Sequence, residues 1–326
     1  ESRIAQAELA AKYGIEGFCY YHYWFNGKRL IERPFNEVLD SGKPDFPFCL
    51  AWANENWTKR WDGRESEMLQ EQVYGGKSDV INHFKYLLKA FLDKRYIRIN
   101  NKPVFIIYRP SAIPELQELI ITWRYLAQRA GLDGIYLIAM KTGFEAYPNN
   151  FWVNNGFDNE LIFQPGNGKI NKLNKWQKLS DLGAAEHVST EAIVVDYEKA
   201  WNVMKEETNK DDNSFSCVVP SWDSSARRAK IGAYILRNSN PNSYQRWLEY
   251  EIEKVIHRNS DERLVVINAW NEWAEGNHLE PDQKFGHGYL KATKNAIDNS
   301  LVTLAKINLI KGNISEAESL AQKALL

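Results

Sequence analysis

Seven short apolar segments, separated by longer amphipathic stretches, constrain the fold of this chain more than any other feature of its sequence. They cover residues 16–25, 46–54, 103–109, 134–140, 157–164, 215–222 and 263–270. Rich in β-branched and aromatic residues, each predicts a buried strand. Between them, residues 79–93, 113–130 and 242–258 show the spacing of amphipathic helices. Strands alternating with helices predict a parallel sheet.

A doubly wound sheet and a (β/α)8 barrel both satisfy this alternation. A dinucleotide-binding sheet would carry a glycine-rich turn directly after a strand, and the sequence has none. We therefore predict an α/β fold of the TIM-barrel type. The chain opens with a helical pattern at residues 2–13, which leaves seven strands where a closed barrel has eight. We infer that the first strand of the barrel is absent from this chain.

The predicted organisation is a barrel domain at residues 1–299 and a helical tail at residues 300–326. Residues 165–214 are polar and predict a long loop, apart from a helix near residues 197–207. The tail shows two helical segments joined at Gly312 and Asn313. It resembles one tetratricopeptide-like unit, which would bind a protein partner, and closing helices of the barrel explain it equally well.

Charge and composition exclude several classes of function. Lys and Arg together number 41 against 42 Asp and Glu, so no overall positive field favours nucleic acid or an anionic membrane. No apolar run reaches the length of a membrane span. The three cysteines, Cys19, Cys49 and Cys217, lie in apolar stretches and suggest buried, reduced thiols rather than disulfides. We predict a cytoplasmic protein with no cofactor and no metal, and with an incomplete N-terminus.

Aromatic and polar side chains gather at the ends of the predicted strands. Because these ends face the active site of a TIM barrel, the side chains are expected to converge on one pocket. Flat rings beside amides, carboxylates and Arg suit sugars, which present apolar C–H faces ringed by hydroxyls. The predicted binding residues are His22, Tyr23, Trp24, Trp52, Asn54, Glu55, Trp57, Tyr108, Arg109, Trp222, Asp223, Trp270, Asn271, His278 and Glu280, and Trp61 and Trp273 belong to the same segments. The alternative is that these rings fill the core.

Two carboxylates, Glu272 and Glu275, follow the last predicted strand and are flanked by Trp270 and Trp273. A pair of carboxyl groups across one cavity is the arrangement that acid–base cleavage of glycosidic bonds uses. Two acids three residues apart also occur in ordinary solvated loops. Their position at a strand end among tryptophans favours a catalytic pair.

Four segments carry a resemblance to a known family. GFCYYHYWFNGKRLIERPF, FCLAWANENWTKRWDG, VVPSWDSSARR and INAWNEWAEGNHLEPD resemble the WbsX-type family of bacterial polysaccharide loci, which is similar to glycoside hydrolase family 99, the endo-α-mannosidase barrel. The resemblance runs from about residue 2 to residue 293. It implies that Glu272 is the base that deprotonates the 2-hydroxyl of the substrate, and that Glu275 is the general acid and later the base.

The resemblance implies a carbohydrate-active enzyme acting on an O-antigen or capsule-type polysaccharide, by retention through the 2-hydroxyl. It leaves hydrolysis and transfer open, because the WbsX-type branch also carries the glycosyltransferase name. No Asp-x-Asp motif is present to hold the cation of a metal-dependent transferase. A metal-independent glycosyltransferase of lipopolysaccharide biosynthesis and a catalytically silent glycan-binding module are the two alternatives.

Overall fold

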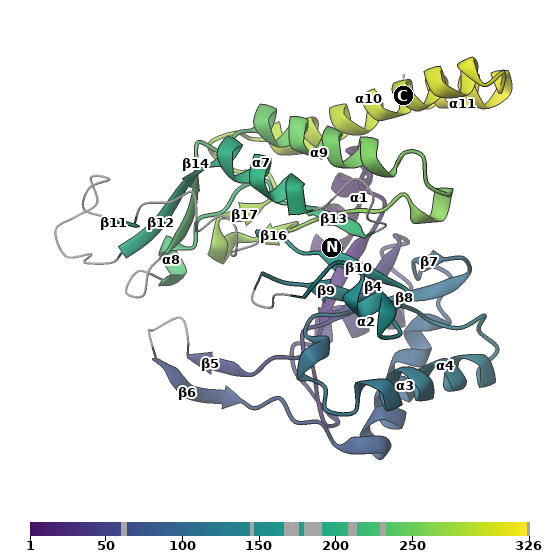
Figure 1. Cartoon of the computed structure of the whole chain (residues 1–326), viewed down its shortest axis with the longest axis vertical. Helices are drawn as coiled ribbons and strands as arrows, with labels where there is room; N and C mark the ends of the chain where they lie inside the picture. Colours follow the sequence, from purple (N-terminus) through teal and green to yellow (C-terminus); the bar gives the residue numbers. More distant parts are fainter. Residues whose placement is uncertain are drawn as a thin grey trace. The chain divides into compact units, whose positions relative to one another are not determined.

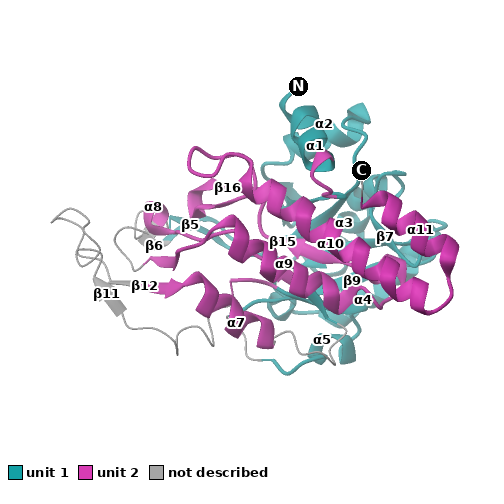
Figure 2. Ribbon diagram, turned by 90° about the horizontal axis from the view of Figure 1, so that it is seen from above, with its two compact units in different colours: residues 1–11, 16–162, 212–215 teal, residues 12–15, 163–211, 216–326 magenta. Residues whose placement is uncertain are grey.

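The computed structural model describes residues 1–59, 64–143, 147–165, 176–178, 191–207, 214–228 and 233–324. Two compact units are distinguished within the chain, shown in teal and magenta in Figure 2. Unit 1 comprises Glu1–Ala11, Glu16–Ile162 and Asp212–Phe215, and unit 2 comprises Lys12–Ile15, Phe163–Asp211 and Ser216–Leu326. Five of the predicted strands therefore fall in unit 1.

The core of unit 1 is a parallel sheet with the strand order β1-β4-β8-β9-β10. Its strands are β1 (Phe18–His22), β4 (Phe48–Trp52), β8 (Lys102–Ile107), β9 (Tyr136–Lys141) and β10 (Asn159–Ile162). The middle strands are apolar apart from Lys102 and Lys141 at their ends, because both faces are buried, as is typical of parallel sheets. The helices are α1 (Ser2–Lys12), α2 (Arg33–Ser41), α3 (Gly76–Phe91), α4 (Leu116–Arg129) and α5 (Phe151–Asn154) (Figure 1).

Short elements decorate this sheet. Two antiparallel hairpins, β2 (Trp24–Phe25) with β3 (Lys28–Arg29) and β5 (Trp57–Lys59) with β6 (Arg64–Gln70), extend from the loops that follow β1 and β4. Strand β7 (Arg98–Ile99) pairs antiparallel with β8, and a 3-10 turn, η2 (Pro110–Ala112), follows β8. The sequence pattern did not predict these hairpins.

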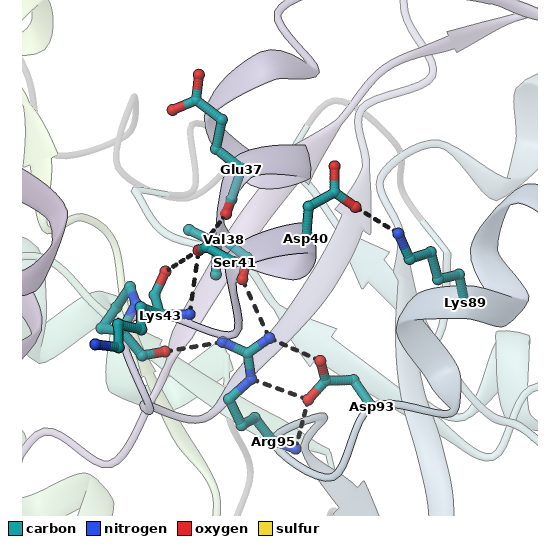
Figure 3. A network of polar contacts seen from close by, with 9 residues as sticks. Glu37, Val38, Asp40, Ser41, Lys43, Lys89, Asp93 and Arg95 are labelled. Atoms are coloured by element: carbon teal, nitrogen blue, oxygen red, sulfur yellow. Dashed lines mark hydrogen bonds and ion pairs between the residues drawn. The ribbon is translucent and has the colours of Figure 1, made fainter.

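A buried arginine connects α2 to the loop after α3 (Figure 3). The Arg95 guanidinium donates to the carbonyls of Pro44 and Val38 at 2.9 and 3.2 Å, and to both carboxylate oxygens of Asp93 at 2.9 and 2.7 Å. This pairing lowers the pKa of Asp93 and raises that of Arg95. Since the Arg95 side chain is only 4% exposed, every hydrogen bond that it makes replaces one to water. Arg95 therefore fixes the end of α2 against the sheet.

Unit 2 contains the remaining parallel pair of strands, β13 (Phe215–Val218) and β15 (Val265–Ile267). Their pairing begins with Ser216 opposite Val265. Its helices are α7 (Tyr197–Glu207), α8 (Ser225–Arg228), α9 (Pro241–Val255) and α10 (Gly288–Ile310), with a 3-10 turn, η5 (Ser260–Glu262). A second sheet joins β11 (Trp176–Lys178), β12 (Glu191–Asp196) and β14 (Tyr234–Arg237). A hairpin of β16 (Asn271–Glu272), the 3-10 turn η6 (Trp273–Glu275) and β17 (Asn277–His278) follows β15.

The C-terminal residues form the two helices that the sequence predicts. Helix α10 begins at Gly288, well before residue 300, and packs on α9, where the Tyr244 hydroxyl lies 3.0 Å from the Thr293 hydroxyl. Helix α11 (Ile314–Lys323) follows Gly312, whose φ of +81° suits glycine. Leu304, Ala305 and Leu320 pack with Ile256 in one apolar cluster. The division into a domain at 1–299 and a tail at 300–326 stays a prediction.

The predicted α/β fold of TIM-barrel type is confirmed. All seven predicted strands and the helices between them are present, and α7 matches the helix expected near residues 197–207. In the polar stretch predicted as loop, the described residues also include β11 and β12. One expectation about the thiols was wrong: Cys49 and Cys217 are buried, but Cys19 is exposed because alternate residues of β1 face outward. In the described part of the chain, no helix has the length and apolarity to cross a bilayer.

Candidate active site

Glu272 and Glu275 lie on the tight hairpin β16-η6-β17 of unit 2. Gly276 completes its turn in the left-handed region, with φ at +57°. A Cβ atom on Gly276 would lie 3.0 Å from Cβ of Asp223 and 3.1 Å from its backbone nitrogen and oxygen. Glycine at this position therefore allows both the turn conformation and the close approach of the segment that follows β13.

Backbone hydrogen bonds anchor the hairpin to that segment. The Asp223 amide donates to the carbonyl of Glu275 at 2.7 Å, and the Ser221 hydroxyl donates to the carbonyl of Gly276 at 2.6 Å. Residues 221–223 lie in the segment that follows β13 (Phe215–Val218), the neighbour of β15 in the parallel pair. The glutamate pair is thus placed by two adjacent strand ends rather than by a free loop.

Arg227, on the short helix α8, lies against both glutamates. Its Nη1 atom is 2.7 Å from Oε1 of Glu275 and 3.6 Å from Oε1 of Glu272. The separation of the two carboxylate oxygens cannot exceed these two distances together, which is inside the roughly 10 Å over which two carboxyl groups act on one sugar ring. The side chains of Glu272, Glu275 and Arg227 are 39%, 22% and 21% exposed. The pair is therefore close, partly shielded and in contact with one cation.

Five further side chains in and around the same hairpin are joined by hydrogen bonds and a ring stack. Glu280 accepts a hydrogen bond from Nε1 of Trp270 at 3.1 Å and another from Nε1 of Trp273 at 2.8 Å. The Trp273 ring stacks on His278, with ring centroids 3.7 Å apart and planes inclined by 16°. Nε2 of His278 lies 3.3 Å from Oδ2 of Asp282. These contacts fix both tryptophans beside the glutamate pair.

In unit 1, predicted binding residues from two adjacent strand ends contact one another. Buried Asn54, after β4, donates to the hydroxyl of Tyr74 at 2.9 Å and to the carbonyl of Arg109 at 2.8 Å, and its Oδ1 accepts from the Arg109 amide at 2.8 Å. The Arg109 guanidinium lies 2.8 Å from Glu55. Burial raises the pKa of Tyr74, which keeps its hydroxyl neutral. Glu55 and Arg109 remain about one-third exposed and can contact a ligand.

Three other predicted residues of unit 1, His22, Trp24 and Trp52, are buried in an aromatic cluster around His83. Trp24 stacks on His83 at 4.6 Å, and Trp52 meets the same ring edge-on at 4.6 Å. Nε2 of His22 lies 2.8 Å from Nε2 of His83. Burial lowers the pKa of His22 to about 3, with the charge of Arg29 adding to the effect, and burial lowers the pKa of His83 as well. In the structure these rings pack together below the surface.

The remaining predicted binding residues divide between exposed and partly buried positions. Tyr23 meets Trp57 edge-on at 5.0 Å in unit 1, and Tyr108 is partly buried. In unit 2, Trp222 and Trp270 are partly buried, whereas Asp223 and Asn271 are exposed. Trp61 lies outside the described residues. A single pocket joining the two groups, and the roles of these residues, stay predictions.

Sequence reasoning missed several residues of these clusters. Arg227 was not among the predicted site residues, and it contacts both glutamates. Trp273 was not included among the binding residues, although it lies between the two glutamates in the chain. No sequence signal marks Asp282, which follows the segment of the two glutamates, or His83, which lies within the amphipathic helix pattern of residues 79–93. Arg227 lies on α8 (Ser225–Arg228), and a helix of only four residues leaves no periodic pattern that would predict it.

Comparison with known proteins relates the chain to carbohydrate-active families. The family profile described as "Glycosyltransferase WbsX" matches residues 1–293. An uncharacterised protein named WxcX, from two strains of Xanthomonas campestris pv. campestris, is 33% identical over 293 residues. The aligned part covers 90% of this chain and 40% of each relative. The chain thus spans less than half the length of the curated relatives that it matches.

Solved structures with a similar fold include a glycoside hydrolase-like protein and a glycoside hydrolase of family 99. A glycoside hydrolase-like protein has a TM-score of 0.56 at 15% identity, over 90% of this chain and 84% of that protein. A GH99 endo-alpha-mannosidase from Bacteroides thetaiotaomicron has a TM-score of 0.53 at 15% identity, over 92% of this chain and 79% of the mannosidase chain. At this identity the likeness shows a shared fold, and it agrees with the family 99 resemblance noted in the sequence.

Proposed function

The chain belongs to the WbsX glycosyltransferase family of carbohydrate-active proteins, and we propose that it cleaves a glycosidic bond in a bacterial polysaccharide of the O-antigen or capsule type. The proposed reaction retains the anomeric configuration and uses the 2-hydroxyl of the substrate in place of an enzyme nucleophile. The single observation that supports it most is the contact of Glu272 and Glu275 with one guanidinium nitrogen of Arg227. Two carboxylates so close together can act on one sugar ring.

In this proposal Glu272 removes the proton of the 2-hydroxyl as its oxygen attacks C1, and the C1–O bond to the leaving group breaks. Glu275 gives its proton to the departing oxygen, so the products of the first step are the freed alcohol and a 1,2-anhydro sugar. Glu275 then removes a proton from water, which attacks C1 and opens the anhydro ring, while Glu272 returns a proton to the 2-oxygen. Two inversions at C1 give net retention.

Arg227 sets a condition on the first step. A guanidinium in contact favours the ionised form of a carboxylate, and Nη1 of Arg227 is 2.7 Å from Glu275. A general acid has to carry a proton. Cleavage of an alcohol leaving group therefore requires that bound substrate draws Arg227 away from Glu275.

The same contact favours a second candidate, metal-independent glycosyl transfer. A glycosyl phosphate or diphosphate donor has a leaving group that departs without protonation, and Arg227 could neutralise the phosphate charge that develops. Glu272 or Glu275 would then deprotonate the acceptor hydroxyl. The family profile carries the glycosyltransferase name, which supports this reading.

One experiment separates the two candidates. The protein is incubated with α- and β-glycosyl fluorides of common hexoses and, in parallel, with nucleotide-diphosphate sugars together with a polysaccharide acceptor, and the products are followed by proton NMR. Release of the hydrolysed sugar from one fluoride, first in the anomeric form of that substrate, supports retaining hydrolysis. Consumption of a nucleotide sugar without fluoride hydrolysis would support transfer. Turnover of neither group by wild-type protein would contradict both proposals.

A further inference from the structure

Trp273 is an exposed aromatic residue whose position is fixed by contacts on its ring face and its ring nitrogen. It is 49% exposed, although large apolar side chains are ordinarily buried. His278 stacks on one face of the indole at 3.7 Å, and Nε1 donates to Glu280 at 2.8 Å. The ring is thus held in place while about half of its surface remains in water.

The partners of Trp273 are themselves held by other residues. The second carboxylate oxygen of Glu280 accepts from Trp270 at 3.1 Å, and His278 pairs with Asp282 at 3.3 Å. Fixing a large side chain costs rotamer entropy, which core residues offset by removing apolar area from water. Trp273 keeps about half of its surface in water, so burial of apolar area offsets only part of the entropy cost of fixing its ring. Packing alone therefore does not explain why this exposed ring is held in place.

The place of Trp273 in the hairpin defines what it can contact. It follows Glu272 directly and lies two residues before Glu275, within the same turn η6. His278, across the hairpin from Asn271, covers one face of the ring. A flat apolar surface beside a carboxylate pair offers stacking to the C–H face of a pyranose.

We propose that Trp273 is a stacking platform for the pyranose unit next to the one that reacts at Glu272 and Glu275. The inference rests on the proposed function, since it places a neighbouring sugar beside the reacting one. It adds that the protein contacts at least two adjacent pyranose units of the polysaccharide, and that Trp273 contributes to the choice between such a chain and a single glycoside. Pre-positioning of the ring by His278 and Glu280 lowers the ordering cost of binding.

The test measures binding separately from turnover. All proteins carry Glu275→Gln, so that catalysis does not consume the ligand, and the probes are a soluble α-mannan and the O-polysaccharide of Xanthomonas campestris pv. campestris. Dissociation constants are measured for this parent, for added Trp273→Ala and Trp273→Phe, and for Tyr125→Ala. Tyr125 is a matched control, because it is 60% exposed on helix α4. Melting temperatures are measured for every variant.

We expect Trp273→Ala to weaken binding of at least one polysaccharide by about tenfold, and Trp273→Phe by less, because a phenyl ring still stacks. Tyr125→Ala should bind as the parent does. Equal binding by the parent and Trp273→Ala, at similar melting temperatures, would overturn the platform and leave the proposed function intact. If the parent binds a polysaccharide through Trp273 but wild-type protein turns over neither fluorides nor nucleotide sugars, the platform stands and the proposed function fails. Binding of neither probe by the parent would overturn the platform.

Discussion

The buried histidine pair of unit 1 predicts a loss of stability in mildly acidic solution. His22 and His83 are 5% and 1% exposed, and their Nε2 atoms lie 2.8 Å apart. One ring nitrogen must donate and the other accept, so the contact requires that the two rings do not both carry a charge. Burial, with the nearby charge of Arg29, lowers the pKa of His22 from 6.5 to about 3, and the pKa of His83 is also lowered well below 6.5.

The sign and size follow from linkage. Because the folded-state pKa values are depressed, the unfolded chain binds more protons than the folded chain as the pH falls below about 6.5, and each imidazole then favours unfolding. The stability contribution is fully present above pH 6.5 and is lost progressively down to about pH 3 for His22. At pH 5.0 the loss is about 2 kcal/mol for His22, and the lowered pKa of His83 acts in the same direction.

Urea unfolding followed by tryptophan fluorescence at pH 7.5 and pH 5.0 measures this loss. His22→Gln should be less stable than wild type at pH 7.5, but its drop between the two pH values should be smaller by about 2 kcal/mol, since one titrating group is gone. Phe105→Leu is the control, because Phe105 contacts both imidazoles and does not titrate. It should lower stability equally at both pH values. An unchanged drop in His22→Gln would refute the reasoning.

Three further predictions concern other parts of the molecule. Asp93→Asn leaves buried Arg95 without its counter-charge and should lower the free energy of unfolding, measured in urea, by about 3 kcal/mol. The control Asp40→Asn removes an exposed partner of Lys89 and should lower the free energy of unfolding by less than about 1 kcal/mol. Gly276→Ala should lower the free energy of unfolding by about 1–3 kcal/mol and reduce turnover, because the Cβ of the alanine would press on Asp223 beside the glutamate pair. Unchanged kinetics of this variant would contradict the described turn. In native protein a thiol reagent should modify Cys19 rapidly, and Cys49 and Cys217 only after denaturation. The latter two are buried, and burial raises the pKa of Cys217 to about 12. Mass spectrometry of the labelled peptides identifies the modified cysteine.

The strands of the parallel sheet could be read from the sequence because their burial is nearly complete. A run such as residues 103–107 is apolar at every position, since both faces of β8 are covered. Exposed hairpins leave no such mark. The strand β6 reads RESEMLQ, in which most residues are polar and the apolar residues do not alternate. Its pattern therefore resembles an ordinary loop.

The candidate site could be predicted in part for a similar reason. Glu272 and Glu275 stood out because they follow a strand and are surrounded by tryptophans, and the structure brings them together. The contact of Arg227 with both glutamates, however, depends on how residues 221–228 fold back on the turn at Gly276. Likewise, nothing in the pattern of β1 distinguishes His22, which packs on His83, from a surface ligand. Tertiary contacts of this kind carry no local signature.

The central claim is that Glu272 and Glu275 carry out different chemical steps on one sugar. The most direct measurement compares kcat/KM of Glu272→Gln and Glu275→Gln, relative to wild type, on a glycosyl fluoride and on the matching alkyl glycoside. Fluoride leaves without protonation, so Glu275→Gln should lose far more activity on the alkyl glycoside than on the fluoride. Glu272→Gln should lose activity on both, because attack by the 2-hydroxyl precedes either departure. Full activity of Glu272→Gln, or equal losses for both variants on both substrates, would contradict the claim.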